Sequence, residues 1–568
     1  MAKKATPDKT KKAKSVKAGK GHIPALPKRG YRDLQEHLAA LDAAGLLVTI
    51  DAPVNKDTEL HPLVRWQFRG GLKEGERKAF LFTNVTDARG RKFDMPVVVG
   101  ALAANQDIYA IGMNAPLEEI GARWERGMAK PIPPKVVKTA PCQEVVWTGK
   151  DLLGDNKGLD ALPVPISTPG FDAAPYFTAT NVFTVDPETG VQNMGTYRAG
   201  LKATNRLAVR MASREGGAGG YLHWLKYQKK GAKTMPCAVV VGAPPIVAYL
   251  GPQKLGTHRD EADVAGGIAG APINMVKCKT NDLMVPAEAE LVIEGKVDTT
   301  YLEPEAPFGE SHGHIALEDF NMIFEVTAIT MKKKPVLASI ISQVTPSESS
   351  VIKRVAYEPM FLAHLRDQLG LRGVKRVALH EPLTNIRKVI FLVIDRATSR
   401  TEVWRALYGA AVLRADCGKY VIAVNDDIDP DDGDAVFWAM AYRANVLTDI
   451  EVLHHRPRGH GPKSGNVNED GTLLIDATLK GDMPPLALPK KEYMEGAKRL
   501  WEKLGLPPLK AQSPWHGYDL GDWFEAWDRN AERAVKGDYA ENGRRTAQRR
   551  ASGIIPETPC REVEGDPK

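Results

Sequence analysis

Between residues 140 and 345 the sequence consists of short apolar runs, rich in β-branched residues, that glycine and proline interrupt at close intervals. Such spacing predicts many short strands joined by turns. The clearest runs are VVWTG, TATNVFTVD, MPCAVVVGAPP, AEAELVIEGKV and MIFEVTAITMKK. A barrel or a sandwich accommodates these strands better than a doubly wound sheet. We therefore expect a β-rich central domain over residues 141–345.

The segment before this domain has a helical period. Residues 31–49 carry apolar side chains at helical spacing, and Gly45 is a stop signal; the apolar residues are Leu34, Leu38, Leu41 and Ala44. Strand-like runs follow at residues 79–85 and 95–102, and a second helix is expected from about Leu117 to Gly127. These elements predict an N-terminal α/β domain over residues 30–140.

The segment after the central domain predicts a parallel sheet. A helical linker at 346–375 leads to the apolar run VIFLVID (389–395), and a second run, YVIAVNDDID, occupies residues 420–429. Between them lies an amphipathic helix that carries Val403, Leu407, Tyr408 and Ala411. A strand, a helix and a strand in this order form a β-α-β unit. We place a C-terminal α/β domain at 376–505, so the predicted fold class is mixed α/β (α+β).

Charge is concentrated at the N-terminus. Nine lysines and Arg29 against Asp8 give residues 1–29 a net charge of +9, so the rest of the chain carries −2 of the total of +7. The arm also lacks the apolar residues that folding needs, which predicts a disordered, solvated segment. A nucleic-acid-binding arm is the alternative, but the folded part offers no basic face, and nucleic acid is not the expected partner.

Cysteine usage and hydropathy indicate a cytoplasmic, soluble protein. The five cysteines form no CxxC pair and their number is odd, which favours a reducing compartment over a disulfide framework. The longest uncharged apolar stretch, from Pro236 to Gln253, is broken by Pro244 and Pro245. It falls short of the roughly 20 residues of a transmembrane helix.

Residues 506–568 form a separate C-terminal arm with an aromatic stripe on a charged background. The stripe has i, i+3, i+4, i+7 spacing and consists of Leu520, Trp523, Phe524 and Trp527. Such a stripe packs either on its own chain or on a neighbouring subunit. The sequence leaves both alternatives open.

The segment EPEAPFGE (303–310) is the strongest candidate for catalysis. Two prolines and a glycine between the acids forbid a regular helix, so Glu305 and Glu310 lie on a turn that can direct both carboxylates into one space. Two carboxylates in one site can keep a neutral acid available near pH 7. The alternative is a solvent-exposed acidic turn.

Three further segments carry polar groups that suit a cation and an anion. Asn193 and Arg198 belong to NMGTYR, His223 to LHW, and Glu261 to HRDEAD. Asn, His and Glu are suitable ligands for Mg²⁺ or Mn²⁺, and arginine can bind a carboxylate or phosphate with two hydrogen bonds. Spacing alone does not bring these residues together, so ordinary structural roles remain the alternative. No P-loop, GxSxG, HExxH or strand-linked GxGxxG motif points to a different chemistry.

Five segments taken together resemble the UbiD family of reversible decarboxylases, which use prenylated flavin mononucleotide (prenylated FMN). They occur in the family's order between about residues 31 and 500: NMGTYR (193–198), LHW (222–224), MVPAEAELVIEG (284–295), EAPFGE (305–310) and GKYVIAVNDDIDP (418–430). The resemblance implies an N-terminal α/β domain, a central flavin-binding split β-barrel and a C-terminal α/β domain that makes the oligomer contacts.

The resemblance also implies roles for individual residues. Arg198, Glu305 and Glu310 would do the acid-base work, with Glu310 as the proton donor. A divalent cation, Mn²⁺ or Mg²⁺, would bridge to the flavin phosphate, and K⁺ would bind near Leu250–Gln253 and share Glu261. The metal ligands would be Asn193, His223 and Glu261, and the flavin would contact Asn193, Thr196, Tyr197, Arg198, Leu222, His223, Gln253, Glu261 and Lys419.

The expected function is therefore the reversible, non-oxidative decarboxylation of an aromatic or α,β-unsaturated carboxylic acid. Loss of CO₂ from an sp² carbon needs an electron sink that no side chain offers, and similarity to the family implies that the prenylated flavin supplies it. The expected partners are the acid, CO₂, a flavin prenyltransferase that supplies the cofactor, and further copies of the chain in a homodimer or homohexamer. The alternatives are a flavin-binding subunit of a multi-component aryl carboxylase and a nucleic-acid-binding protein.

The chain departs from the family pattern in two places. It has EAPFGE where many members have EGPFGE, a change that the loop should tolerate. Histidines follow Glu310 and gather again in HHRPRGH (454–460), near the region that faces the substrate in the family. Basic groups there could bind a second carboxylate, a phenol or a CoA thioester, and no role is assigned to His312, His314, His454, His455 or His460.

Overall fold

The computed structural model describes residues 25–211, 219–253, 255, 259–305, 307–457, 469–481, 483, 486–509, 511, 525–556, 558 and 560.

The N-terminal domain begins with a capped helix. Asp33 and Glu36 form a capping box at the start of α1 (Leu34–Ala43). Gly45 has a φ of 70° and lies just after the helix, as predicted. Ala44 is exposed, contrary to the prediction, because the helix ends before it.

A four-stranded sheet forms the centre of this domain. Its order is β1-β3-β6-β22, with bounds β1 (Leu47–Ile50), β3 (Ala79–Phe82), β6 (Val97–Val99) and β22 (Leu337–Ser339). The last strand comes from beyond the central sheet and pairs in parallel with β6. The other elements of the domain are α2 (Leu60–Arg69), α3 (Gln106–Met113), α4 (Ile120–Ala129), β2 (Val54–Asn55), β4 (Val85–Thr86) and β5 (Lys92–Phe93).

The central sheet is antiparallel and confirms the β-rich prediction. Its path is β11-β10-β14-β17-β21-β13-β12-β9, and β8 and β18 also pair with β21. The strands are β8 (Val145–Thr148), β9 (Tyr176–Phe177), β10 (Thr180–Val185), β11 (Gln192–Gly195), β12 (Ala199–Ala203), β13 (Arg206–Val209), β14 (Thr234–Val241), β17 (Leu291–Asp298), β18 (Glu303–Glu305) and β21 (Asp319–Met331). The path ends at β11 and β9, an open arrangement that agrees with a split barrel.

The central sheet is buried on both faces. In β14, Cys237 and Val239 pack into one apolar cluster with the N-terminal domain, whereas Ala238 and Val240 pack into the other. A strand buried on both sides is apolar throughout, which explains the run MPCAVVVGA. Around the sheet lie α5 (Gly219–Lys229), α6 (Pro245–Ala248), α7 (Glu261–Ala269), β7 (Lys135–Val136), β15 (Asn274–Lys277), β16 (Met284–Pro286), β19 (Phe308–Gly309) and β20 (Ile315–Ala316).

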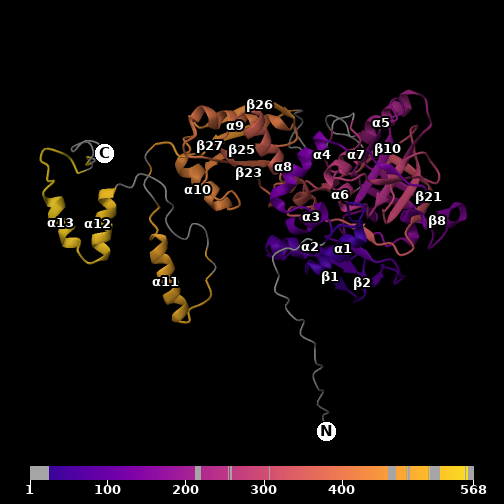
Figure 1. The fold of residues 1–568 in the computed structure, drawn as a ribbon, viewed down its shortest axis with the longest axis horizontal. Helices are drawn as coiled ribbons and strands as arrows, with labels where there is room; N and C mark the ends of the chain where they lie inside the picture. Colours follow the sequence, from indigo (N-terminus) through magenta and orange to yellow (C-terminus); the bar gives the residue numbers. More distant parts are fainter. Residues whose placement is uncertain are drawn as a thin grey trace, which may run out of the picture.

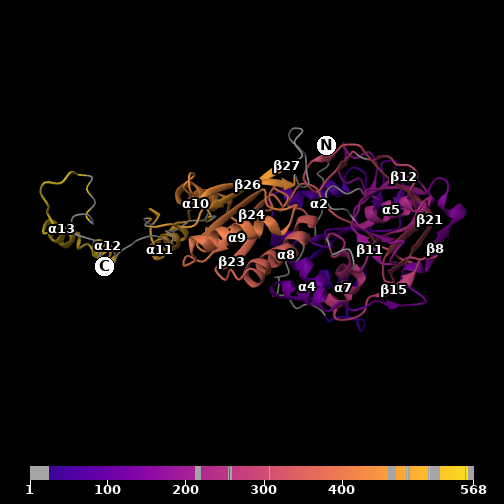
Figure 2. The ribbon, with the colours of Figure 1, turned by 90° about the horizontal axis from the view of Figure 1, so that it is seen from above.

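Helix α8 (Glu348–Ala363) connects the body to the C-terminal domain. Figures 1 and 2 show it between α4 and the C-terminal sheet, and it packs against both α4 and β23. The sheet has the order β23-β24-β25-β27-β26, and the parallel pairing of β24 with β25 confirms the predicted β-α-β unit. Its elements are β23 (Val374–Leu379), β24 (Val389–Ile394), α9 (Arg400–Leu413), β25 (Tyr420–Asn425), α10 (Gly433–Arg443), β26 (Ile450–Pro457) and β27 (Glu469–Asp476).

Three further helices extend away from the C-terminal sheet in Figures 1 and 2: α11 (Lys491–Lys503), α12 (Glu525–Val535) and α13 (Tyr539–Ala547). None of them contains a buried residue. Of the predicted aromatic stripe, Leu520, Trp523 and Phe524 lie outside the described residues, and Trp527 is 43% exposed. No helix in the described part of the chain has both the length and the apolar surface that a membrane crossing needs.

Candidate active site

A cavity of about 840 Å³ lies between the central sheet, α5, α7 and α8. Three of the segments that line this cavity were singled out in the sequence. They are β11 with the residues that follow it, α5 and the acidic turn. The predicted residues among its lining are Asn193, Thr196, Tyr197, Arg198, Leu222, His223, Gln253, Glu261 and Glu310. The structure therefore brings together segments that are more than 100 residues apart in the sequence.

Arg198 links the two glutamates at one end of this cavity. Its Nε and Nη2 donate to the two carboxylate oxygens of Glu305 at 2.7 and 2.8 Å, and its Nη1 donates to Glu310. The Arg198 guanidinium also lies over the ring of Phe308, 4.7 Å from its centroid. Glu305 is 2% exposed, so the alternative of a solvent-exposed acidic turn is wrong.

Local pairing explains this placement. Glu305 ends β18, which pairs with β21, while Phe308 and Gly309 form β19, which pairs with β20. Glu305 at the end of one short strand and Glu310 just after the other both reach Arg198. Burial acts to lower the pKa of Arg198, but the hydrogen bonds and charges of Glu305 and Glu310 outweigh it and hold that pKa above its ordinary value.

Sequence reasoning missed a second arginine at this end. Arg210 Nη1 lies 3.6 Å from Glu305 Oε2, its Nε lies 3.8 Å from Glu310 Oε1, and its Nη2 lies 3.2 Å from Asp319 Oδ2. Arg210 follows β13, which pairs with both β12 and β21. The sequence signal was weak, since an arginine at a strand end is normally a surface residue. The carboxylates of the buried Glu305 and the partly exposed Glu310 thus face two cations rather than one.

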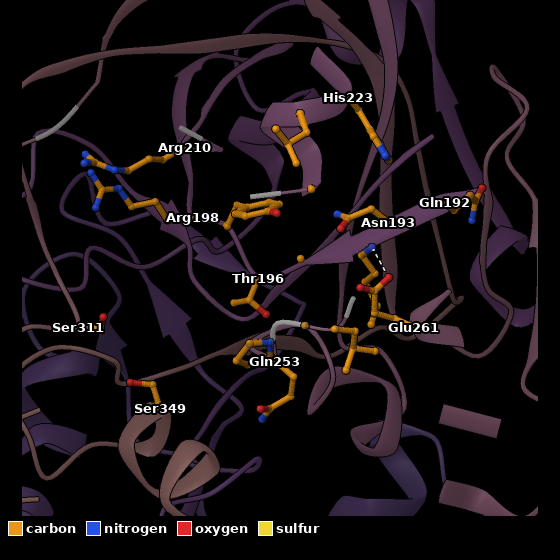
Figure 3. A pocket seen from close by; sticks show the side chains of 18 of the residues that line it. Gln192, Asn193, Thr196, Arg198, Arg210, His223, Gln253, Glu261, Ser311 and Ser349 are labelled. Carbon is orange, nitrogen blue, oxygen red and sulfur yellow. Dashed lines mark hydrogen bonds between the residues drawn. The ribbon is translucent and has the colours of Figure 1, made fainter. Parts of the chain in front are cut away.

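The other end of the cavity holds the three predicted metal ligands. Figure 3 shows Asn193, His223 and Glu261 on one side, opposite Arg198 and Arg210. Asn193 comes from β11, His223 from α5 and Glu261 from the first turn of α7. A Cβ on Gly219 would lie 1.9 Å from the side-chain oxygen of Asn193, so a larger residue there would displace this amide.

Hydrogen bonds orient two of these ligands. Glu261 Oε2 accepts from the Met194 backbone N–H at 2.9 Å, and His223 Nδ1 is hydrogen-bonded to Thr184 Oγ1 at 2.9 Å. The latter bond leaves Nε2 as the imidazole nitrogen for a ligand. Burial raises the pKa of Glu261 to about 7 and lowers the pKa of His223. A neutral imidazole and a buried carboxylate both favour a bound cation.

The donor set tests whether a divalent metal fits. One amide oxygen, one imidazole nitrogen and one carboxylate suit Mg²⁺ or Mn²⁺ when phosphate and water complete the shell. Within the described ranges, no group of three His, Cys, Asp or Glu side chains could hold a metal ion. A metal held by His223 and Glu261 would therefore need the amide oxygen of Asn193 as a third protein ligand.

The wall between the two ends has features that suit a polar ligand. The side-chain nitrogen of Gln253, which lines the cavity, is buried and makes no hydrogen bond within the described structure, and the same holds for the side-chain nitrogen of Asn181, which lies behind this wall beside Gly251. A Cβ on Gly251 would lie 2.4 Å from Thr196 Oγ1, so the backbone approaches this hydroxyl closely. Unsatisfied amide donors along a wide cavity are suited to the acceptor oxygens of a flavin chain. The residues present thus fit a flavin phosphate as well as a metal.

Not every predicted residue reaches this cavity. Lys419 is absent from its described lining; it forms an ion pair with Asp470 at 2.9 Å on a small neighbouring pocket. His454 and His455 are exposed on β26, and His455 pairs with Glu469. Neither residue is among the described residues that line the cavity, so neither supplies the basic group that the sequence raised as one possibility. His460 lies outside the described residues.

The two histidines after the acidic turn are also not among the described residues that line the cavity. The rings of His312 and His314 lie 5.8 Å apart, beside the turn between β19 and β20. Ser311 does line the cavity, in Figure 3 on the same side as Ser349. Ser311, and neither of these histidines, therefore lines the cavity next to Glu310 in the described structure.

Comparison with known families accounts for all three domains. Residues 135–344 match the 3-octaprenyl-4-hydroxybenzoate carboxy-lyase Rift-related domain, residues 38–125 match the N-terminal domain of the same enzyme family, and residues 351–477 match its C-terminal domain. The chain belongs to the UbiD family. Its members are carboxy-lyases, and this UbiD chain is accordingly an enzyme of the decarboxylase class.

Solved structures agree with this membership. The UbiD-class enzyme HmfF from Pelotomaculum thermopropionicum, in complex with FMN, has 26% identity and a TM-score of 0.70, over 80% of this chain and 95% of HmfF. An evolved dimeric HmfF in complex with prFMN has 26% identity and a TM-score of 0.68, over 80% and 97%. Vanillic acid decarboxylase from Sedimentibacter hydroxybenzoicus, at 21% identity and a TM-score of 0.67 over 84% and 99%, shares the fold.

Two further basic residues of this UbiD chain line the cavity and were not predicted. Lys353 projects from α8, and Arg387 lies in the turn between β23 and β24. Burial lowers the pKa of Lys353 to about 7, with the charge of Arg387 acting in the same direction and those of Asp416 and Glu310 opposing it. Helical periodicity marks Lys353 only as one more polar residue on α8, so no local pattern could have identified it.

Proposed function

We propose that this enzyme is a prenylated-FMN-dependent, non-oxidative and reversible decarboxylase of an aromatic or α,β-unsaturated carboxylic acid. The observation that carries the proposal is the contact of Arg198 with Glu310, beside it on the wall of one large cavity, and with the buried Glu305. An acid on the cavity wall that an arginine holds in place can deliver a proton to a carbon that has lost CO₂. The FMN and prFMN complexes of HmfF support the flavin.

The cofactor would occupy the cavity between its two ends. Asn193, His223 and Glu261 would hold Mn²⁺ or Mg²⁺ against the flavin phosphate, because carboxylate and phosphate repel each other without a cation. Backbone carbonyls near Leu250–Gln253, together with Glu261, would hold K⁺. Bound there, the prenylated flavin supplies the electron sink for the carbon–carbon bond that breaks. Thr196, Tyr197, Leu222 and Gln253 would contact it, and Lys419 is proposed to contact its phosphate.

The chain's own residues would carry the proton. In the decarboxylation direction Glu310 gives a proton to the carbon that CO₂ leaves, and solvent then restores the acid. In the carboxylation direction the Glu310 carboxylate removes the same proton. Arg198 fixes the position of Glu310 in both directions, since it also binds the buried Glu305 through two hydrogen bonds. Arg198 and Glu305 are thus positioning residues for the acid.

The first test measures cofactor and proton transfer separately. After co-expression with a flavin prenyltransferase, the protein should carry a flavin that mass and visible spectrum identify as prenylated. A colourless protein without flavin would contradict the proposal. Glu310→Gln keeps the size and much of the hydrogen bonding of the side chain but removes the acid, so turnover should fall by roughly 10²–10⁴ while flavin still binds.

A matched control separates this effect from a change in surface charge. Glu303 lies on the same short strand as Glu305 and pairs with Arg206 outside the cavity lining. Glu303→Gln should retain turnover. Deuterium exchange from solvent into candidate product arenes or alkenes reports the same proton transfer without the acid substrate. Exchange at the parental rate in Glu310→Gln would exclude this residue as the acid.

Partners and location belong to the same proposal. We expect a homo-oligomer, a dimer or a hexamer, and a flavin prenyltransferase that supplies the cofactor. The four cysteines Cys142, Cys237, Cys278 and Cys417 are buried free thiols, which supports a reducing, cytoplasmic environment. The alternative of an accessory subunit of an aryl carboxylase predicts flavin binding without exchange, so the same assay distinguishes the two.

A further inference from the structure

Lys353 is a buried amine that the proposed reaction does not use. The residue is 8% exposed and lines the cavity. Among the described residues, no hydrogen bond or ion pair within 4.0 Å satisfies its amino group. Burial of an unpaired ammonium group is strongly unfavourable. Such a group is retained where a ligand completes its surroundings.

A second cation faces the same part of the cavity. Arg387 lines it from the β23–β24 turn, and its Nη1 lies 2.9 Å from Asp416 Oδ2. The Nε of Arg387 is buried and makes no hydrogen bond to the residues described. One donor of this guanidinium therefore remains available after its ion pair with Asp416. Ser311, Ser342 and Ser349 add hydroxyl groups to the same region.

From this arrangement we infer that Lys353 and Arg387 form a binding site for a second carboxylate of the substrate, which makes the preferred substrate an aromatic dicarboxylic acid. The inference rests on the proposed function, since it assigns the substrate class of that site. Arg198 and Arg210 are already engaged by Glu305 and Glu310. Lys353 and Arg387 thus supply cationic donors that are not bound to Glu305 or Glu310.

The chemistry favours a carboxylate over other groups. Two oxygens can accept from an ammonium and a guanidinium at the same time, with charge-assisted hydrogen bonds on both. A neutral hydroxyl group would satisfy only one donor and would leave the positive charge uncompensated. Burial lowers the pKa of Lys353 to about 7 although the charges of Asp416 and Glu310 act against it, so an anion bound beside this amine would favour its charged form.

The experiment measures binding rather than turnover. Isothermal titration calorimetry on the cofactor-loaded enzyme gives the affinities for benzoate, 4-hydroxybenzoate, isophthalate and terephthalate. The better of the two dicarboxylates should bind at least about tenfold more tightly than benzoate, as a charge-assisted pair provides. Lys353→Met should abolish this preference and leave benzoate affinity and flavin content unchanged. Lys353→Arg should retain it.

Lys375→Met is the matched control, because Lys375 lies on β23, pairs with Asp395 and is absent from the described lining of the cavity. It should keep the parental preference. If Lys353→Met folds poorly, Arg387→Gln provides an independent variant that should also weaken dicarboxylate binding. Thermal denaturation of each variant shows which comparison applies.

Each contrary result overturns the inference in its own way. Equal affinity of the parent enzyme for benzoate and both dicarboxylates excludes a second anion site. An equal loss for all acids in Lys353→Met would mean that Lys353 binds the reacting carboxylate, and loss of flavin would mean that it binds the cofactor. Tighter binding of 4-hydroxybenzoate than of either dicarboxylate would assign the site to phenols. A protein that prefers dicarboxylates but binds no flavin would refute the proposed function and leave this site standing.

Discussion

Removal of the Arg198 side chain should destabilise the central domain as well as stop the reaction. Glu305 has a side chain that is only 1% exposed, and Arg198 supplies two hydrogen bonds to it. After Arg198→Ala, the nearest remaining donors are Asn321 Nδ2 at 3.4 Å and Arg210 Nη1 at 3.6 Å. Neither replaces a bond of 2.7 Å, so a buried carboxylate is left poorly paired.

The magnitude follows from that burial. Breaking one partner out of a buried ion pair costs about 3–5 kcal/mol, and the nearby Arg210 places this case toward the lower end, about 3–4 kcal/mol. For a domain of this size such a loss lowers Tm by roughly 6–16 °C. Differential scanning calorimetry should detect this shift in the transition of the central domain, and turnover should fall with it because Glu310 loses its anchor.

A double variant separates stability from catalysis. Arg198→Met with Glu305→Leu removes both buried charges and should recover most of the lost Tm, because apolar replacement of a complete buried pair is often neutral. Turnover should stay abolished in the double variant. The reasoning is refuted if Arg198→Ala melts at the parental temperature, or if the double variant melts as low as the single one.

Three other perturbations test separate parts of the molecule. Exhaustive chelation, or His223→Ala, should release flavin, and unchanged flavin content after both would refute the metal assignment. Truncation after Leu509 should lower the size or the Tm of the oligomer, because α12 and α13 bury no residue in the single chain; unchanged sedimentation and melting would show that the arm docks nowhere. Burial raises the pKa of Glu348 to about 7, so the stability that its protonated form provides is complete below about pH 4.5 and is lost as the pH rises through 7. In Glu348→Gln, stability measured by urea unfolding should therefore depend less steeply on pH between 5 and 7.5, and an unchanged slope would contradict this assignment.

The sequence predicted those parts of the fold in which local pattern and tertiary structure agree. The short runs of the central domain became antiparallel strands, and the unit around α9 became a parallel pair. Pairing between distant segments was not readable. The three-residue strand β22 joins the N-terminal sheet after the chain has passed through the whole central domain. A strand that short carries no periodic signal that could assign it to one sheet rather than another.

The same limit applies to the site. Motif resemblance located Asn193, Arg198, His223, Glu261 and Glu310, and all five line the cavity. Arg210, Lys353 and Arg387 were missed because the sequence alone does not distinguish a buried basic residue at a strand end, on a helix or in a turn from an exposed one. Only the pairing of β13 with β21 and the packing of α8 on β23 turn such residues inward. Conversely, His454 and His455 are conspicuous in the sequence, which assigned them no role, and they lie on an exposed strand.

The position of α8 has a consequence for how such an enzyme changes its selectivity. Lys353 belongs to α8, whereas Arg387 belongs to the turn that follows β23, and Glu358 of α8 accepts from the Leu379 backbone N–H at the end of that strand at 2.9 Å. The spacing of the two cations is therefore set by a contact outside the cavity. Substitutions along the seam between α8 and β23 would widen or narrow that spacing without touching a ligand. Substitutions in the contact between α8 and β23 could thus change which acid the enzyme prefers, although these residues do not touch the substrate.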